Sequence, residues 1–321
     1  MYRQSTVAVV IPAYNEEELI QDTLSGIPSY VDRVYVVNDG SKDGTEERVQ
    51  EFSSRDPRFV YIRHETNKGV GAAIVTGYSR SFADKMDITA VMAGDNQMDP
   101  RELPKLLDPI VNGEADYAKG HRLESRTTAK GMSDFRYLGN NILTFLTRFA
   151  AGNNKINDPQ NGYTAISNHV FKKMSPGSIF TWYGYCNDML VKLSTYGFKI
   201  KDVVIPARYG RERSKIAYPK YIIRISRLLF NELIWRLNYQ NMSKSARKAN
   251  SVMVIGGGMS SMSFTVATLS LITPLSIMGT PKPAESPVGM LIVLSLVGLG
   301  MAYLGFVLKR GGKIGMEGKK V

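Results

Sequence analysis

Short β-rich runs alternate with helical stretches through the first third of the chain, and this alternation constrains the fold more than any other feature. The runs are continuously apolar, which is typical of strands buried on both faces of a sheet. Strands that alternate with helices predict an α/β fold with a mostly parallel sheet covered on both faces. The expected strands are Val7–Ile11, Val34–Val37, Val60–Arg63 and Ile88–Met92, and the expected helices are Glu16–Ile27, Thr45–Phe52 and Gly71–Phe82.

A polar motif follows each expected strand. In sheets of this kind, ligands bind beyond the carboxyl ends of the strands. Each motif alone is typical of an ordinary turn or helix start, but four motifs in these places indicate one binding site. They are Pro12–Glu17, Asn38–Thr45, Asn67–Ala73 and Gly94–Pro100.

These four motifs resemble those of the family-2 glycosyltransferases of the GT-A fold, in particular the polyprenyl-phosphate hexosyltransferases such as dolichyl-phosphate mannose and glucose synthases. The resemblance runs from Val7 to about Lys215. It implies a GT-A, Rossmann-like catalytic domain at residues 1–217. It also implies transfer of a hexose from a nucleotide sugar (a UDP- or GDP-hexose) to polyprenyl or dolichyl phosphate, with inversion at the anomeric carbon.

The resemblance assigns the nucleotide mainly to the motifs after the first three strands. Glu16 and Asp39 are expected to accept hydrogen bonds from the base and the ribose. Glycine at position 69 lets the backbone approach the ligand. The full expected nucleotide-binding set is Pro12, Ala13, Tyr14, Glu16, Asp39, Lys68, Gly69 and Gly94.

The fourth motif matches the family's metal motif, with Asp95 as its last Asp and Gln97 as the Gln that follows. Oxygen ligands suit Mg²⁺ or Mn²⁺, which would bridge the diphosphate and neutralise the leaving group. Many relatives carry another Asp two residues earlier, where this chain has Ala93. Asp99 is a candidate for the second carboxylate, and whether it reaches the ion is left open.

A second group of motifs resembles the family's acceptor series. Arginine binds phosphate through two parallel hydrogen bonds, and lysine binds it as a point charge. The motifs are Gly120–Arg122, Arg136, Asp158–Tyr163, Tyr185–Leu190 and Arg211–Lys215. The residues expected to hold the acceptor phosphate are Arg122, Arg136, Gln160, Arg211, Ser214 and Lys215.

The resemblance places Asp95, Asp188 and Arg211 in the catalytic centre. A phosphate monoester is largely dianionic at pH 7 because its second pKa is near 6. The acceptor therefore needs orientation and not a general base. Asp188 is expected to bind the sugar or position the cations.

Two uncharged runs, Ser251–Met278 and Val288–Leu308, interrupt the globular pattern. About 20 apolar residues in a helix cross the hydrocarbon core of a bilayer. The runs predict a two-span transmembrane hairpin at residues 251–310, followed by a tail at 311–321. A pair of buried helices in a soluble core is the alternative, which the absence of any polar stripe disfavours.

The formal net charge is +12, and lysine and arginine are dense from Lys199 to Lys248. Basic residues beside apolar spans favour anionic lipid headgroups over nucleic acid. By the positive-inside rule both ends of the hairpin face the cytoplasm. We therefore expect a multi-pass cell-membrane protein with its catalytic domain and both termini cytoplasmic, and amphipathic juxtamembrane helices at residues 218–250.

Several residues receive a structural interpretation. The single cysteine, Cys186, excludes an intrachain disulfide and fits a reducing compartment. The three histidines, His64, His121 and His169, lack metal-ligand spacing and are expected to be structural or solvent-facing. Trp182 is assigned to packing or the interface. Small residues in the second apolar run fit either oligomer contacts or packing within the hairpin.

Two alternatives stay open. One is a processive polysaccharide synthase of the same fold, although the Gln-x-x-Arg-Trp motif of such enzymes is absent from this sequence. The other is a catalytically inactive homologue that acts as a membrane scaffold, which Ala93 alone supports.

Overall fold

The structure is a computed structural model that describes residues 1–208 and 218–240. The chain divides into two compact units, Met1–Lys215 and Ile216–Val321. In the second unit the described part is one helix, α8 (Tyr218–Gln240). No helix within the described ranges is long and apolar enough to cross a membrane. The hairpin expected at 251–310, the tail, and Arg211, Ser214 and Lys215 lie outside those ranges.

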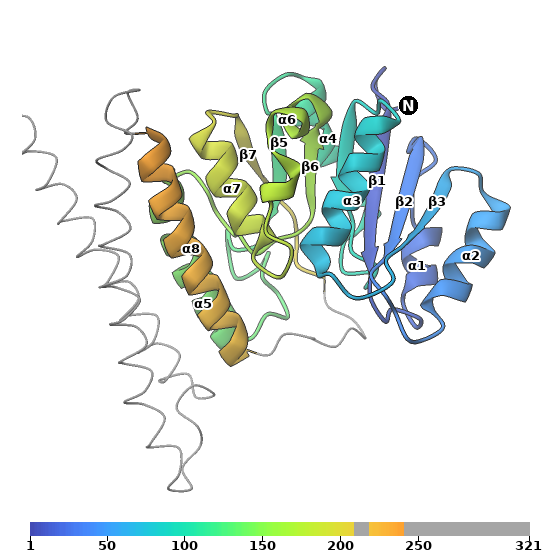
Figure 1. Cartoon of the computed structure of the whole chain (residues 1–321), viewed down its shortest axis with the longest axis horizontal. Helices are drawn as coiled ribbons and strands as arrows, with labels where there is room; N and C mark the ends of the chain where they lie inside the picture. Colours follow the sequence, from blue (N-terminus) through green and yellow to red (C-terminus); the bar gives the residue numbers. More distant parts are fainter. Residues whose placement is uncertain (209–217, 241–321) are drawn as a thin grey trace, which may run out of the picture. The chain divides into compact units, whose positions relative to one another are not determined.

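The first unit is built on a seven-stranded sheet with the order β3-β2-β1-β4-β6-β5-β7 (Figure 1). Strand β6 pairs antiparallel with both of its neighbours, and all the other pairs are parallel. Every strand except β6 therefore runs in the same direction. The strands are β1 (Val7–Ala13), β2 (Arg33–Asn38), β3 (Phe59–Arg63), β4 (Ile88–Val91), β5 (Tyr117–His121), β6 (Thr164–Ser167) and β7 (Ile200–Val204).

Helices cover both faces of the sheet, which confirms the predicted α/β class. The helices of the first unit are α1 (Ile20–Ser25), α2 (Thr45–Arg55), α3 (Val70–Ala83), α4 (Leu103–Val111), α5 (Asp134–Ala151), α6 (Asn168–Lys173) and α7 (Tyr185–Thr195), with short 3₁₀ turns η1 (Pro100–Glu102) and η2 (Pro176–Ser178).

The two faces of β1 carry different cores. Val7, Val9 and Ile11 belong to a buried cluster that includes apolar residues of α1, α2 and α4. Val10 points to the other face and contacts α3, where a Cβ added at Gly77 would lie closer than 3.0 Å to its side chain. The continuous apolar run of β1 is explained by this burial on both sides.

The first helix is shorter than expected. The sequence predicts a helix over Glu16–Ile27, but α1 begins at Ile20. Asn15 adopts a left-handed conformation with φ of 54°. The backbone N–H of Glu16 donates to Thr45 Oγ1 at 2.8 Å, so the residues after β1 are held by the loop after β2 instead of starting a helix.

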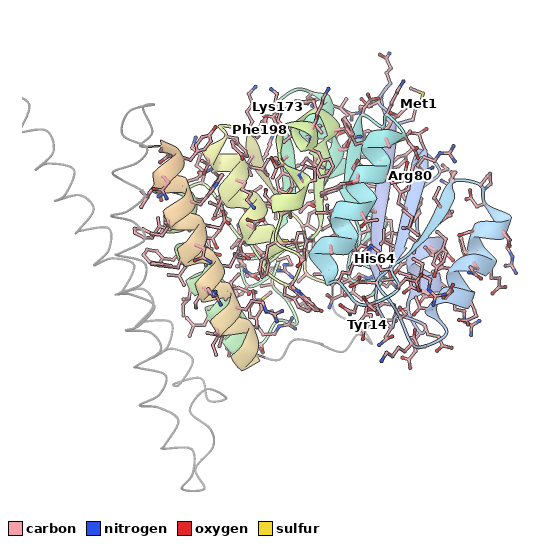
Figure 2. All side chains as sticks on the ribbon, in the orientation of Figure 1. Met1, Tyr14, His64, Arg80, Lys173 and Phe198 are labelled. Carbon is pink, nitrogen blue, oxygen red and sulfur yellow. The ribbon has the colours of Figure 1, made fainter. Side chains whose placement is uncertain are left out.

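The direction of the strands gathers the sequence motifs at one edge. Strands β1 to β5 and β7 end at the same edge, and β6 begins there, because β6 alone is reversed. We call this the carboxyl edge. Figure 2 shows Tyr14 and His64, which follow β1 and β3, in the lower half of the view, and Met1 and Phe198 in the upper part.

Candidate active site

The loops after β1 and β2 are fastened to each other at the carboxyl edge. The backbone N–H of Asn15 donates to Ser41 Oγ at 3.0 Å, and Asn15 Oδ1 accepts from the backbone N–H of Lys42 at 2.8 Å. Glu17 accepts from the N–H of Gly44 at 3.0 Å. The first two motifs therefore form one rigid unit that presents Glu16.

The end of β1 supports the neighbouring motifs through its backbone. The carbonyl of Pro12 accepts from the N–H of Gly94 at 3.3 Å, and the carbonyl of Ala13 accepts from the N–H of Asp39 at 2.8 Å. The structure thus brings together Pro12, Ala13, Asp39 and Gly94, four residues of the expected nucleotide set.

Asp39 is buried, with 3% of its surface exposed. Its Oδ1 lies 2.7 Å from His64 Nδ1 and accepts from the N–H of Lys68 at 3.0 Å, and its Oδ2 accepts from the N–H of Gly69 at 2.8 Å. His64 Nε2 lies 3.0 Å from Thr76 Oγ1. Asp39 therefore holds the third motif in place, and His64 has the structural role that the sequence left open.

The third motif packs tightly against the segment before α7. Gly69 has a φ of 98°, and a Cβ there would lie closer than 3.0 Å to the carbonyl of Thr181. The N–H of Ala72 donates to that carbonyl at 3.1 Å. Only glycine at positions 69 and 71 allows this close approach.

The fourth motif forms a turn in which Asp95 Oδ1 accepts from the backbone N–H of Gln97 at 3.1 Å. Asn96, at the tip, has a φ of 58°. The N–H of Ala93 donates to Met98 Sδ at 3.1 Å. The turn therefore holds Asp95 and Gln97 side by side, and Ala93 contributes no side-chain oxygen.

Asp99 is engaged with a cation of the protein. Its two oxygens accept from the Arg101 guanidinium, with the shortest contact 2.6 Å, and its Oδ1 caps η1 by accepting from the N–H of Arg101 at 3.0 Å. The Arg101 guanidinium holds the pKa of Asp99 below its ordinary value, and Arg208 lowers it further. Asp99 thus pairs with an exposed arginine, and its role as second metal carboxylate stays a prediction.

The described residues offer few carboxylates to a divalent cation at this edge. Within residues 1–208 and 218–240, no group of three or more His, Cys, Asp or Glu could hold a metal ion. Mg²⁺ is usually held by one or two carboxylates together with substrate phosphates. One carboxylate at Asp95 beside a diphosphate fits this pattern.

The pKa of Tyr183 is affected by charges of both the nucleotide and the metal motif. Burial raises the pKa of its hydroxyl above the ordinary value, and the charges of Glu16 and Asp95 raise it further. Glu16 and Asp95 thus both lie within electrostatic range of one tyrosine. The sequence motifs did not predict a role for Tyr183. It lies outside every motif and more than 80 residues from Asp95 in the chain.

In the acceptor half, Arg122 forms a buried ion pair with Asp158. Its Nε and Nη2 lie 2.8 and 2.9 Å from the two carboxylate oxygens, and its backbone N–H donates to Oδ2 at 2.9 Å. Asp158 is completely buried. Burial would raise the pKa of Asp158, but the Arg122 charge outweighs it and the pKa falls below its ordinary value.

A second buried ion pair supports the same loop. Lys119 Nζ lies 2.9 Å from Asp202 Oδ1 and donates to the carbonyls of Gly120 and Asn157. Asp202 Oδ2 accepts from the N–H of Asn157 at 2.7 Å. The pair joins β5, β7 and the segment that leads to Asp158.

Gln160 and Arg136 are placed by different elements. Gln160 Nε2 donates to Asn187 Oδ1 at 3.0 Å, and Asn187 Nδ2 donates to Thr147 Oγ1 at 2.7 Å, which links α5 and α7. Arg136 lies in the first turn of α5, whose N-cap Ser133 accepts its backbone N–H.

Asp188 differs from its expected position near the sugar. It is completely buried, its Oδ1 lies 2.6 Å from Lys192 Nζ, and its Oδ2 accepts from the backbone N–H of Phe180 at 2.8 Å. The reason is that α7 begins at Tyr185, and its first turn faces inward. Beside it, burial raises the pKa of the Cys186 thiol to about 11, so this cysteine is not a nucleophile at neutral pH.

Comparison with known proteins agrees with this arrangement. A model of the family described as "Glycosyl transferase family 2" matches residues 8–175. UDP-N-acetylglucosamine–dolichyl-phosphate N-acetylglucosaminyltransferase of Methanococcus voltae is 29% identical over 216 residues, which cover 63% of this chain and 86% of the relative. Polyprenol monophosphomannose synthase of Mycolicibacterium smegmatis is 31% identical over 202 residues, which cover 61% and 75%.

Among solved structures, the chain is similar to glucosyl-3-phosphoglycerate synthase of Mycobacterium tuberculosis in complex with Mn²⁺, uridine diphosphate and phosphoglyceric acid. The TM-score is 0.53 at 22% identity, and the match covers 73% of this chain and 78% of that one. At this identity the likeness establishes the GT-A type of fold.

Proposed function

The chain belongs to glycosyl transferase family 2, and from this premise we propose that it transfers a sugar from a nucleotide diphosphate donor to polyprenyl or dolichyl phosphate with inversion. The names of the relatives from Methanococcus voltae and Mycolicibacterium smegmatis support a lipid phosphate acceptor. The observation that carries the proposal is that the donor and metal motifs, together with Arg122 and Gln160 of the acceptor series, adjoin strand ends at one sheet edge.

The donor half binds the nucleotide through rigid backbone. Glu16 is presented by the fastened loops after β1 and β2, and Asp39 orders the backbone of Lys68 and Gly69. In this proposal Pro12, Ala13 and Tyr14 line the same region, and Gly94 closes it beside β1. Preformed backbone of this kind lowers the ordering cost of ligand binding.

Asp95 and Gln97 are the residues that would hold Mg²⁺ or Mn²⁺. When bound, the ion supplies positive charge to the diphosphate and so stabilises the leaving group. The chain's own contribution is to orient the Asp95 carboxylate through the N–H of Gln97. Asp99, whose oxygens accept from Arg101, stays the candidate for a second metal carboxylate.

The acceptor half delivers an anionic headgroup to the same edge. Arg122 is fixed by Asp158, so its guanidinium loses little conformational entropy when a phosphate binds. Arg136, Gln160, Arg211, Ser214 and Lys215 complete the proposed phosphate site. Arg211, Ser214 and Lys215 are assigned to this site from their motif alone, since they lie outside the described residues.

The lipid acceptor implies that the enzyme works at a membrane. We assign the anchoring to the two apolar runs at 251–310, with the basic residues before and after them on the cytoplasmic side. The catalytic unit would then meet a headgroup at the cytoplasmic surface.

Transfer of label tests the proposal directly. The full-length chain in detergent is incubated with polyprenyl phosphate, Mn²⁺ and one radiolabelled donor at a time: UDP-glucose, UDP-N-acetylglucosamine or GDP-mannose. We expect a labelled lipid extractable into organic solvent with one donor, lost with EDTA. The Asp95→Asn variant should lower the rate on the order of 100-fold.

Glu114→Gln is the matched control. Glu114 is exposed, pairs with Lys201 and lies before β5 at the opposite edge. This variant should retain the wild-type rate. A wild-type protein that folds and forms no labelled lipid with any donor, with or without metal, would instead favour the inactive scaffold that Ala93 suggests.

A further inference from the structure

The segment Ser178–Gly184, here called the aromatic segment, connects η2 to α7 and lies against the start of α3. The carbonyl of Thr181 accepts from the N–H of Ala72 at 3.1 Å. Added Cβ atoms at Gly69 and Gly71 would both lie closer than 3.0 Å to the backbone of this segment. The aromatic segment is therefore fitted to the third nucleotide motif.

The segment carries two half-exposed aromatic side chains, and one of them, Trp182, lies at the third nucleotide motif. The Trp182 ring lies next to Gly69, with its Cδ2 at 2.9 Å from an added Cβ. Tyr183 lies in the field of Glu16 and Asp95. Trp182 and Tyr183 are 38% and 39% exposed, so their rings present surface on which a base or a sugar can pack.

One buried ion pair of α7, Asp188 with Lys192, anchors the backbone of the aromatic segment. Asp188 Oδ2 accepts from the N–H of Phe180 at 2.8 Å, and Asp188 Oδ1 lies 2.6 Å from Lys192 Nζ. Lys192 Nζ also donates to the carbonyl of Ser178. Asp188 is completely buried and Lys192 is 5% exposed, one helical turn apart on α7. Both partners of the pair thus grip the segment's backbone.

A buried ion pair adds little stability compared with an apolar pair of the same volume, because desolvation offsets the attraction. An apolar pair could not form the hydrogen bonds to the backbone of Ser178 and Phe180. These bonds fix the backbone position of the segment. Removing either partner would release one of these bonds.

We propose, on the premise of the function proposed above, that Asp188 and Lys192 are positioning residues that set the aromatic segment against Gly69 and Gly71, so that its half-exposed Trp182 and Tyr183 line the nucleotide-sugar site. Asp188 then acts through Phe180 and touches no substrate. Tyr183 becomes a donor-binding residue of the site.

Trp182 supplies a reporter for the test. The chain contains two tryptophans, and the other, Trp235, lies on α8. In a full-length Trp235→Phe protein in detergent, the emission of Trp182 is followed while UDP or GDP is added with Mn²⁺. We expect a saturable change with one of the two nucleotides. The Trp182→Phe protein, which keeps Trp235, should show no change.

A double-mutant cycle then measures the connection. In the reporter background, Lys192→Met and Tyr183→Ala should each weaken binding of the nucleotide about tenfold. The double variant should be weakened by about the same factor as either single variant, since both act through one contact. A roughly hundredfold loss in the double variant, or wild-type affinity in Lys192→Met, overturns the proposal.

The transfer assay distinguishes a displaced aromatic segment from general unfolding of the variant. Lys192→Met should raise the KM for the nucleotide sugar and leave the KM for polyprenyl phosphate unchanged. If this variant fails to fold, the pair Asp188→Asn with Lys192→Met is used, because Asn retains an acceptor for the N–H of Phe180 and leaves no charge buried alone. The same rise in donor KM supports the proposal, and a wild-type donor KM refutes it.

The outcomes also distinguish this inference from the proposed function. If the effects on binding are non-additive but no labelled lipid forms, the positioning role of Asp188 and Lys192 is supported and the proposed transfer to a lipid phosphate is refuted. A labelled lipid product with an unchanged donor KM in Lys192→Met keeps the function and overturns the positioning pair. Absence of binding to either nucleotide in the wild-type protein overturns both.

Discussion

Three buried carboxylates at the carboxyl edge each fasten a segment of the protein's own backbone. Asp39 accepts from the N–H groups of Lys68 and Gly69, Asp158 accepts from the N–H of Arg122, and Asp188 accepts from the N–H of Phe180. Charge-assisted bonds of this kind are stronger than neutral ones. The backbone positions of the loops that would contact the substrates are thus fixed by buried carboxylates.

His64 offers a test of this arrangement in the donor half. His64→Ala removes the partner 2.7 Å from Asp39 Oδ1, which costs about 1–3 kcal/mol when a buried acceptor loses its bond. We expect a lower melting temperature and weaker nucleotide binding, measured by thermal denaturation and calorimetry. His169→Ala is the control, because His169 is 59% exposed. Equal losses in both variants would contradict the role assigned to His64.

Asp158 predicts how stability depends on pH. Its pKa is lower in the folded protein than the ordinary 3.8. Such a group stabilises the fold fully above its unfolded pKa, and the contribution is lost as pH falls through the lower, folded value. Asp158→Asn lacks this contribution. The difference in melting temperature between wild type and variant should therefore be largest at neutral pH and shrink below about pH 4.

Asp134→Asn is the matched control for that measurement, since the carboxylate of Asp134 is 92% exposed. Its melting temperature should follow the wild-type curve. A difference between wild type and Asp158→Asn that grows on acidification would show that the Arg122 pair does not lower the pKa of Asp158.

At the scale of elements, the sequence predicted β1 to β4, α2 and α3 because their apolar patterns are local. It did not predict β5 or β7, since Lys119 and Asp202 interrupt their apolar character. Lys119 is buried because it pairs with Asp202 across the two strands and donates to the carbonyls of Gly120 and Asn157. No pattern within either strand contains that information.

The candidate site, like the fold, could be predicted from the sequence only where the signal is local. The motifs placed Glu16, Asp39 and Asp95 at one edge, because each follows a strand. The buried position of Asp188 and the packing of Trp182 against Gly69 depend on contacts between distant segments, so the sequence alone could not reveal them.

The contact between α3 and the aromatic segment can be tested by adding a single methyl group. In Gly71→Ala the new Cβ would lie too close to the carbonyl of Phe180, so one of the two elements must shift. Overpacking of this kind costs about 1–3 kcal/mol. We expect a lower melting temperature together with weaker nucleotide binding.

Gly177→Ala is the control for that change, because nothing lies within 4 Å of a Cβ at position 177. It belongs to η2, directly before the aromatic segment. Wild-type nucleotide affinity in Gly71→Ala would indicate that the segment does not contribute to the donor site.

At the scale of the whole molecule, the expected membrane attachment depends on residues 251–310. We predict that the full-length protein sediments with membranes, remains in the pellet after extraction with alkaline carbonate, and is released by detergent. Two uncharged runs of this length insert into a bilayer, while a surface-bound protein is washed off. Release by carbonate alone would contradict the hairpin.

The reversed direction of β6 has a consequence for how such proteins diversify. Strands β5 and β6 are hydrogen-bonded neighbours, with Tyr117 opposite Ile166, and the chain between His121 and Thr164 leaves and re-enters the sheet at the same edge. The segment between His121 and Thr164 starts and ends on two hydrogen-bonded neighbouring strands. It can therefore be exchanged as one unit, here called the cassette, without altering the register of the remaining strands. Because this cassette carries Arg122, Arg136 and Gln160, grafting it between homologues should transplant the preference for an acceptor while the recipient keeps its own donor.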